Sequence, residues 1–295
     1  MNISFEYYRI FYYVAKYENI TKAAMVLKSS QPNVTRIIHL LEDQLDCRLF
    51  LREPRGLKLT EEGKRLYDHV AIACQHLLDA EAELCWNKNI CSGTIELGVT
   101  ETALHLFLLK HLHGFQQKYS DIKIRIQNNT TPGILKALLN GRLDLAIVTT
   151  PFELNDTFAC EDLMTFREVP AGGSEYRALA GHPMSLKEFR FLSIIGLGYG
   201  TASYEYYRKV FMEQKLDYEP AMEVATADLV IPLLQNNLGV GFIPEPLAAP
   251  FFEDQSLVPL SLNVPLPSRD VKMLWDKSLS QSRAAATFCD YLRSL

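Results

Sequence analysis

The sequence predicts an α/β protein of more than one domain: a helical head, a long connecting helix and a two-lobed α/β part. Three observations predict this class. The 295 residues have ordinary globular composition, 48% hydrophobic and 22% charged, and the chain is longer than one typical domain. Apolar residues recur at helical spacing through residues 1–90. Beyond residue 93, short apolar runs alternate with helical patterns, as in doubly wound sheets.

The first 60 residues predict three helices and a β-ribbon. One apolar stripe marks the first helix, formed by Phe5, Tyr8, Phe11, Tyr12 and Ala15. Asn19 or Thr21 can cap a short second helix, Lys22 to Lys28, and Ser30 can cap a third. Pro32 is tolerated in the first turn of that third helix. The tight polar turn at residues 28–30 is typical of a helix-turn-helix.

The third helix has two distinct faces when its residues are placed 100° apart. The inner face is aliphatic and consists of Val34, Ile37, Ile38, Leu41 and Leu45. The outer face carries Pro32, Arg36, His39 and Asp43, with Thr35 on its flank. Because its only acid comes last, the first two turns suit contact with DNA. The chain has net charge −5, but residues 20–60 carry +3, enough for a local basic patch.

The head is followed by a ribbon and a long helix. Residues 47–51 and 56–59 can pair, with Arg52 and Arg55 near the tip. Thr60 starts a helix that runs to about Trp86, roughly 40 Å at ~1.5 Å per residue. The small head cannot bury a helix of that length, so we expect a partner helix to cover it. Residues 87–93 form the predicted linker.

The α/β part is predicted as two runs of strands and helices, separated by a Pro/Gly-rich stretch near 150–185. The first run has strands at 95–99, 123–127 and 145–148, and helices at 103–118 and from 131. The second has strands at 191–195, 221–224 and 240–243, and helices at 204–215 and 227–236. A last strand, 272–275, and helix, 284–295, could complete either lobe.

Hydroxyl side chains gather after strand ends and at helix starts in this part. They include Thr100, Thr102, Thr130, Thr131, Thr149, Thr150, Thr201, Ser203 and Thr226. Each can be a simple helix cap. However, the carboxyl ends of strands in an open sheet face one crevice, so together they predict a pocket for a small ligand. Helix N-termini there would favour an anion, and Glu101 counts against one. The glycine turn containing Gly198 is expected to form a pocket wall.

No constellation of residues indicates an enzyme, a metal or a cofactor. The turn at residues 194–200 has Thr201 where a dinucleotide-binding motif needs its third glycine. The two residues His111 and His113 fall on different helix faces. The six cysteines form no C-x-x-C pair, and we expect Cys160 and Cys289 to be inert buried thiols more readily than a redox couple.

Nothing in the sequence indicates a membrane segment or a signal peptide. No apolar run approaches 18 residues, and the N-terminus is charged and tyrosine-rich. We therefore expect a cytoplasmic protein with no membrane partner. One rival remains open: a small-molecule-binding α/β protein, or an enzyme, whose helical head serves only oligomerisation.

Four segments closely resemble the LysR-type transcriptional regulators: residues 16–24, 29–45, 48–63 and 141–148. The resemblance implies a winged helix-turn-helix over 1–60, a linker and dimerisation helix over 61–87 and a hinge over 88–93. Residues 94–295 would form an effector-binding domain like a type II periplasmic binding protein. Its lobe I would span about 94–162 and 267–295, and its lobe II about 163–266.

The resemblance also implies site residues and partners. It assigns phosphate contacts to Lys22, Arg52 and Arg55. It assigns base contacts to Gln31, Asn33, Thr35 and Arg36. The implied DNA-binding surface also includes Ser30, Pro32 and His39. The effector cleft would include Thr100, Thr102, Thr131 and the 201–203 turn. The implied partners are double-stranded promoter DNA, a second copy in a dimer or dimer of dimers, and RNA polymerase. His39, Ile37 and Asp46 depart from common family residues, so the operator and the effector stay open.

Overall fold

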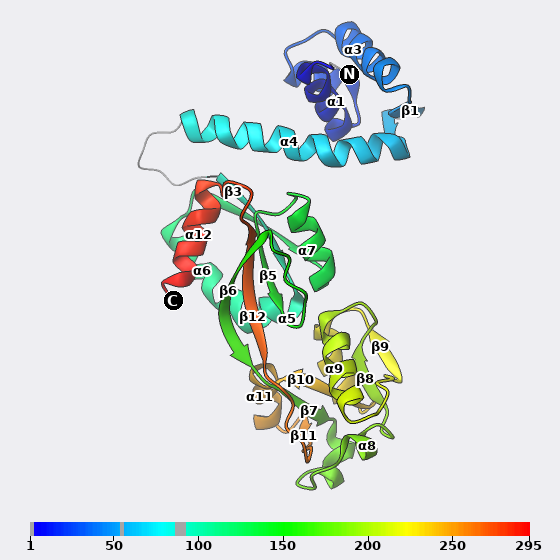
Figure 1. Ribbon diagram of the computed structural model, residues 1–295, viewed down its shortest axis with the longest axis vertical. Coiled ribbons are helices and arrows are strands. Elements are labelled where there is room, and N and C mark those ends of the chain that lie inside the picture. Colours follow the sequence, from blue (N-terminus) through cyan, green and yellow to red (C-terminus); the bar gives the residue numbers. More distant parts are fainter. Residues whose placement is uncertain (1–2, 54–55, 86–92) are drawn as a thin grey trace. The chain divides into compact units, whose positions relative to one another are not determined.

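The computed structural model describes residues 3–53, 56–85 and 93–295 (Figure 1). The chain divides into two compact units, Met1–Lys88 and Asn89–Leu295, which are described separately. The first unit is helical with one small ribbon, and the second is α/β with two sheets. These are the classes of structure that the sequence predicts for the two parts.

The first unit contains the predicted helix-turn-helix. Its elements are α1 (Phe5–Tyr17), α2 (Ile20–Val26), α3 (Gln31–Leu45), β1 (Phe50–Glu53), β2 (Gly56–Leu59) and α4 (Glu61–Cys85). Asn19 caps α2 by accepting from the backbone N–H of Lys22, so this helix begins two residues earlier than predicted. The ribbon is antiparallel and begins at Phe50, three residues later than predicted.

The core of this unit joins all of its helices. Phe11, Val14, Val34 and Leu41 are fully buried, and the apolar face predicted for the third helix is therefore confirmed. Phe5 was expected in the buried stripe, but it is exposed, because the covered face of α1 is centred on Ile10, Phe11 and Val14.

Helix α4 packs on α1 near its beginning. The ring of Tyr67 stacks on Tyr12 at a centroid distance of 6.0 Å, and Val70 and Cys74 are buried. One to two turns further along, Leu77 and Leu78 are exposed. The predicted end of this helix at Trp86 lies outside the described residues.

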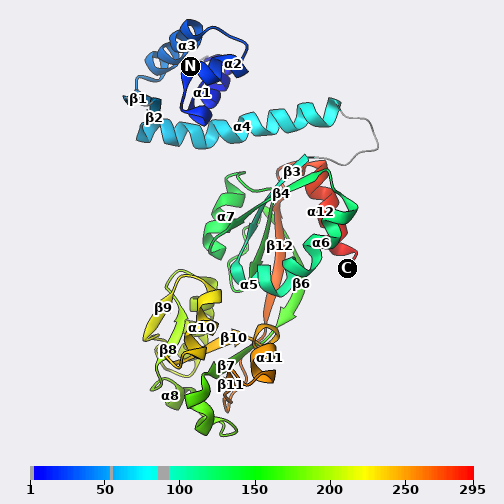
Figure 2. The same ribbon diagram turned by 180° about the vertical axis from the view of Figure 1, so that it is seen from behind.

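Lobe I of the second unit is a five-stranded sheet between two layers of helices (Figure 2). Helix α7 (Thr131–Leu139) packs on one face, and α6 (Leu109–Lys118) and α12 (Arg283–Arg293) pack on the other. The strand order is β4-β3-β5-β12-β6. The strands are β3 (Gly93–Val99), β4 (Ile122–Asn128), β5 (Leu145–Thr149), β6 (Phe158–Phe166) and β12 (Arg269–Asp276).

Lobe II is a second five-stranded sheet with the order β11-β7-β10-β8-β9. Its strands are β7 (Glu168–Gly172), β8 (Ile194–Leu197), β9 (Met222–Val224), β10 (Val240–Pro244) and β11 (Val258–Pro259). Its helices are α8 (Leu186–Phe189), α9 (Ala202–Glu213), α10 (Val230–Gln235) and α11 (Glu245–Glu253). The chain passes between lobes twice, from β6 into β7 and from the segment after β11 into β12.

Several predicted elements need correction. The stretch near 150–185 was expected to separate two runs, but it contains β6 and β7. The strand predicted at 191–195 lies at 194–197, because residues 191 and 192 still make helical-turn hydrogen bonds to Glu188 and Phe189. The helix predicted at 103–118 starts at Glu101 as α5 (Glu101–Ala103) and contains a π-turn over 104–108. The last strand and helix complete lobe I.

Candidate functional sites

Helix α3 presents its predicted outer face to solvent. Pro32, Arg36, His39 and Asp43 are exposed, while the opposite face is buried in the head. Ser30 caps the helix by accepting from the backbone N–H of Asn33 at 3.4 Å. The exposed face therefore begins at a helix N-terminus, where backbone N–H groups add to the positive potential.

Two sets of hydrogen bonds hold the polar side chains of this face. Arg36 Nη2 donates to Asn33 Oδ1 at 3.1 Å, and Asn33 Nδ2 donates to Ser29 Oγ at 3.1 Å. Thr35 Oγ1 donates to the backbone oxygen of Gln31 at 3.0 Å, and the Gln31 side chain accepts from Thr21 at 3.4 Å. The four residues predicted to read bases are thus held in two separate groups, Arg36 with Asn33 and Thr35 with Gln31.

The predicted phosphate contacts lie on neighbouring elements of the same unit. Lys22 is exposed on α2. Arg52 lies in β1, opposite Leu57 in the ribbon. Arg55 lies outside the described residues.

A buried acid near the end of α3 was not predicted. Glu42 Oε1 accepts from the backbone N–H groups of Leu49 at 2.8 Å and Phe50 at 3.2 Å, and Oε2 accepts from Arg48 at 2.8 Å. Burial alone would raise the pKa of Glu42, but these donors outweigh burial and lower it. The ionised carboxylate therefore ties the end of α3 to the first strand of the ribbon.

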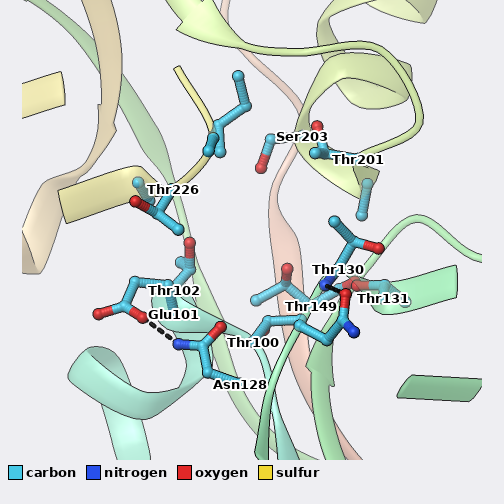
Figure 3. Close-up of a pocket in the computed structure, with 15 residues that line it drawn as sticks. Thr100, Glu101, Thr102, Asn128, Thr130, Thr131, Thr149, Thr201, Ser203 and Thr226 are labelled. Carbon is cyan, nitrogen blue, oxygen red and sulfur yellow. Dashed lines mark hydrogen bonds between the residues drawn. The ribbon is translucent and has the colours of Figure 1, made fainter. Parts of the chain in front are cut away.

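The two lobes of the second unit line a cavity of about 310 Å³ (Figure 3). That volume suits a small molecule. The strand ends and helix starts of both lobes contribute polar side chains to it. The predicted residues that line the cavity are Thr100, Thr102, Thr130, Thr131, Thr149, Thr201, Ser203 and Thr226.

Of the residues predicted to form the pocket, Thr150 and Gly198 do not line the cavity. Thr150 Oγ1 accepts from the backbone N–H of Asp270 at 2.9 Å. Gly198 is turned away by its backbone contacts. Its backbone N–H donates to Val224 O and its carbonyl accepts from Thr201 Oγ1, so the residue is turned toward β9 and the start of α9. Leu197, immediately before it, lines the cavity instead.

The hydroxyl groups of the cleft differ in how much of their bonding capacity is used. Thr201 donates to Gly198 O at 3.0 Å and accepts from the N–H of Tyr204 at 3.1 Å, so both of its functions are engaged. Thr130 accepts from the N–H of Gly133 at 3.4 Å. Thr100 Oγ1 is buried and has no hydrogen-bond partner within the described chain.

Three further polar side chains line the cleft and were not singled out as ligands from the sequence: Glu101, Asn128 and Asn129. Glu101 Oε1 contacts His105 Nε2 at 2.7 Å, and its other oxygen accepts from Asn128 Nδ2 (Figure 3). Asn128 ends β4, so the rule that places polar residues after strand ends could have found it. No Lys or Arg belongs to the described residues that line this cavity.

Family models match both units of the chain. Residues 5–64 match the bacterial regulatory helix-turn-helix protein of the lysR family, and residues 91–295 match the LysR substrate binding domain. The second match alone covers more than two thirds of the chain. The chain belongs to the LysR family. It is a LysR-type transcriptional regulator.

Individual relatives of this LysR regulator are distant but cover almost the whole chain. The regulator YofA of Bacillus velezensis is 25% identical over 289 residues, 97% of this chain and 96% of the relative. A probable RuBisCO transcriptional regulator of Cyanidium caldarium is 26% identical over 292 residues, 93% of this chain and 88% of the relative.

Solved structures share the fold of this regulator. CbnR, a LysR family transcriptional regulator, has a TM-score of 0.69 at 16% identity and covers 99% of this chain and 98% of its own. The probable transcriptional regulator PA0477 from Pseudomonas aeruginosa has a TM-score of 0.70 at 18% identity, covering 99% and 97%.

Within the described part of the effector-binding unit, neither Cys160 nor Cys289 has an activated thiol. Burial raises the pKa of Cys289 to about 11, and it also raises the pKa of the half-buried Cys160. Both thiols are therefore poor nucleophiles at neutral pH. Over the described residues, no helix of this LysR regulator has the length and apolar character needed to span a membrane.

Proposed function

We propose that this LysR regulator recognises its operator with the outward face of α3. The observation that supports this most strongly is the contrast between the two faces: an aliphatic side locked in the core, and a solvent-facing side with ordered donors. We assign base contacts to Gln31, Asn33, Thr35 and Arg36. Lys22, Arg52 and Arg55 would hold phosphates, and Ser30, Pro32 and His39 complete the surface.

Regulation is proposed to come from a small molecule in the interlobe cleft. Eight hydroxyl residues from both lobes line this cavity. A molecule that contacts both lobes binds the closed arrangement better than an open one, and so shifts the population toward closure. The lobe angle would in turn bias the arrangement of subunits on DNA.

The active form is proposed to be a dimer or a dimer of dimers. Leu77 and Leu78 leave apolar surface exposed on α4. The same helix from a second copy would cover that surface, as in a two-stranded coiled coil. We also propose that the protein acts in the cytoplasm, contacts RNA polymerase at its promoters and carries out no enzymatic reaction. Two of its relatives are named as transcriptional regulators.

Selection of bound genomic fragments tests the proposal. The full chain is mixed with sheared genomic DNA, and the retained fragments are sequenced. We expect a shared motif, and binding that weakens by about 10³–10⁵ between 50 and 200 mM salt if 6–10 phosphates are contacted. If the retained fragments have the same sequences as the input DNA, the result would instead favour the alternative in which the helical head serves only oligomerisation.

A further inference from the structure

A buried ion pair lies beside the cleft, where the lobes meet. Arg269 and Glu168 have side chains only 1% and 2% exposed, and Arg269 Nη1 lies 2.5 Å from Glu168 Oε1. Arg269 is the first residue of β12 in lobe I, and Glu168 is the first residue of β7 in lobe II. The pair therefore joins the two crossovers between the lobes.

The same guanidinium contacts a cleft hydroxyl from each lobe. Nη2 donates to Thr149 Oγ1 at 3.2 Å, and Nη1 donates to Ser203 Oγ at 3.0 Å. Nε donates to the backbone oxygen of Thr150 at 2.7 Å. Thr149 ends β5 in lobe I, whereas Ser203 lies in the first turn of α9 in lobe II, and Figure 3 shows them on opposite sides of the cavity.

These contacts decide the polarity of the two hydroxyls. Guanidinium has only donors, so each hydroxyl oxygen that it contacts must accept. The hydroxyl proton of Thr149 and that of Ser203 are then left to donate to another group. Both residues line the cavity, so an acceptor group on a ligand bound there can receive these protons. Thr130 is similar, since its oxygen already accepts from Gly133.

We propose that Arg269 is a positioning residue that fixes Thr149 and Ser203 as hydrogen-bond donors to the effector. The effector then carries an acceptor group, a carboxylate or carbonyl oxygen, at this end of the cleft. By donating to one group, the two hydroxyls link lobe I to lobe II. The inference rests on the proposed function of the cleft and adds to it the polarity of the ligand and the residue that sets it.

The rings around Arg269 keep its planar group in place. Its guanidinium carbon lies 5.0 Å from the Tyr206 ring centroid and 5.4 Å from that of Phe166. A lysine could replace the charge opposite Glu168, but it lacks the planar fork that reaches four oxygens at once. The Arg269→Lys variant therefore keeps the positive charge opposite Glu168 and removes the contacts that orient the two hydroxyls.

Two opposite probes test the polarity in the full chain. Acetate has acceptor oxygens and no donor, whereas methylammonium has donors and no acceptor. Threonine methyl signals of the cleft, followed by NMR during each titration, give the dissociation constants. We expect acetate to bind at least tenfold more tightly than methylammonium. In Arg269→Lys, the acetate dissociation constant should rise about 3–10-fold, the size of one lost hydrogen bond.

The double variant Glu168→Met with Arg269→Met is a second test, because buried ion pairs exchanged for apolar side chains often leave folding intact. It should show the same loss of acetate binding. Arg293→Gln is the matched control: Arg293 pairs with Glu161 outside the cleft, and its loss should change acetate affinity by less than twofold.

Each outcome decides a different point. Unchanged acetate binding in both Arg269 variants overturns the role of Arg269 and leaves the cleft assignment intact. Equal binding of the two probes by the unaltered chain overturns the polarity, even where a variant fails to fold. Absence of any cleft response to either probe contradicts the effector site itself, and with it this inference.

Discussion

Replacing Glu42 by Ala is expected to destabilise the helix-turn-helix unit by about 3 kcal/mol. The Glu42 side chain is only 5% exposed. It accepts hydrogen bonds from the backbone N–H groups of Leu49 and Phe50, and neither N–H has another acceptor among the described residues. Leu49 is fully buried, so its N–H cannot turn to water after the substitution. A buried donor left unpaired costs about 1–3 kcal/mol, and Phe50, which is less buried, belongs at the lower end.

The ion pair with Arg48 adds little to this sum. The Arg48 side chain is 68% exposed, and pairs with such exposure contribute less than about 1 kcal/mol. Glu42→Gln keeps an oxygen that can accept from the backbone and loses only the charge. We therefore expect a loss of about 1 kcal/mol for this variant, a third of the effect of Ala.

The pH dependence has a definite sign. The pKa of Glu42 is lowered in the folded protein from a usual value of 4.5, so the unfolded chain binds a proton more readily than the native one. This contribution to stability is complete above pH 4.5 and is lost as the pH falls through the lower, folded pKa. Glu42→Gln should remove that part of the acid sensitivity.

Hydrogen exchange of residues 46–53 in the full chain measures these effects locally, and urea unfolding measures them globally. The exposed Glu6, paired with Arg9 on α1, provides a control, and Glu6→Gln should change little. A loss below about 1 kcal/mol for Glu42→Ala, or equal losses for Ala and Gln, would refute the reasoning.

Three further substitutions have expected outcomes. Asp46→Gly should increase the free energy of unfolding by about 0.5 kcal/mol, because Asp46 follows the last residue of α3 with φ 51°. The urea midpoint should therefore rise slightly, and a lower midpoint would contradict this. Gly98→Ala should cost lobe I about 1–3 kcal/mol in thermal unfolding, since its Cβ would lie 2.5 Å from Leu143 Cδ1; unchanged unfolding would show that the core yields freely. Leu77→Asp should convert the dimer to a monomer in sedimentation velocity at micromolar concentration, and an intact dimer would place the interface elsewhere.

The sequence predicts the faces of α3 well because helical periodicity is a local property. Val34 and Leu41 are buried and Arg36 is exposed, as the 100° spacing requires. The hydroxyls of the cleft are also predictable, since strand ends and helix starts can be located from the sequence. Eight of the nine hydroxyl residues predicted by that rule line the cavity. Thr150 does not, because its Oγ1 accepts from the backbone N–H of Asp270, and Gly198 does not, because its backbone pairs with Val224.

The missed features depend on contacts between distant parts of the chain. Strand β7 contains Pro170 and Gly172, which disfavour a strand, yet it lies inside its sheet between β10 and β11. Strand β6 is an edge strand, so its sequence lacks a clear apolar alternation. Arg269 lies 101 residues from Glu168, and nothing near either residue indicates that the two meet in the core.

Discrimination between operator and random DNA by Arg36→Ala tests the central claim most directly. The unaltered chain should prefer a selected genomic fragment by at least about 10³-fold. Arg36→Ala should reduce that preference by roughly 5–150-fold, the worth of one good base contact of 1–3 kcal/mol, while Arg208→Ala in lobe II leaves it unchanged. Full discrimination by Arg36→Ala would contradict the assignment of this face of α3 to base recognition.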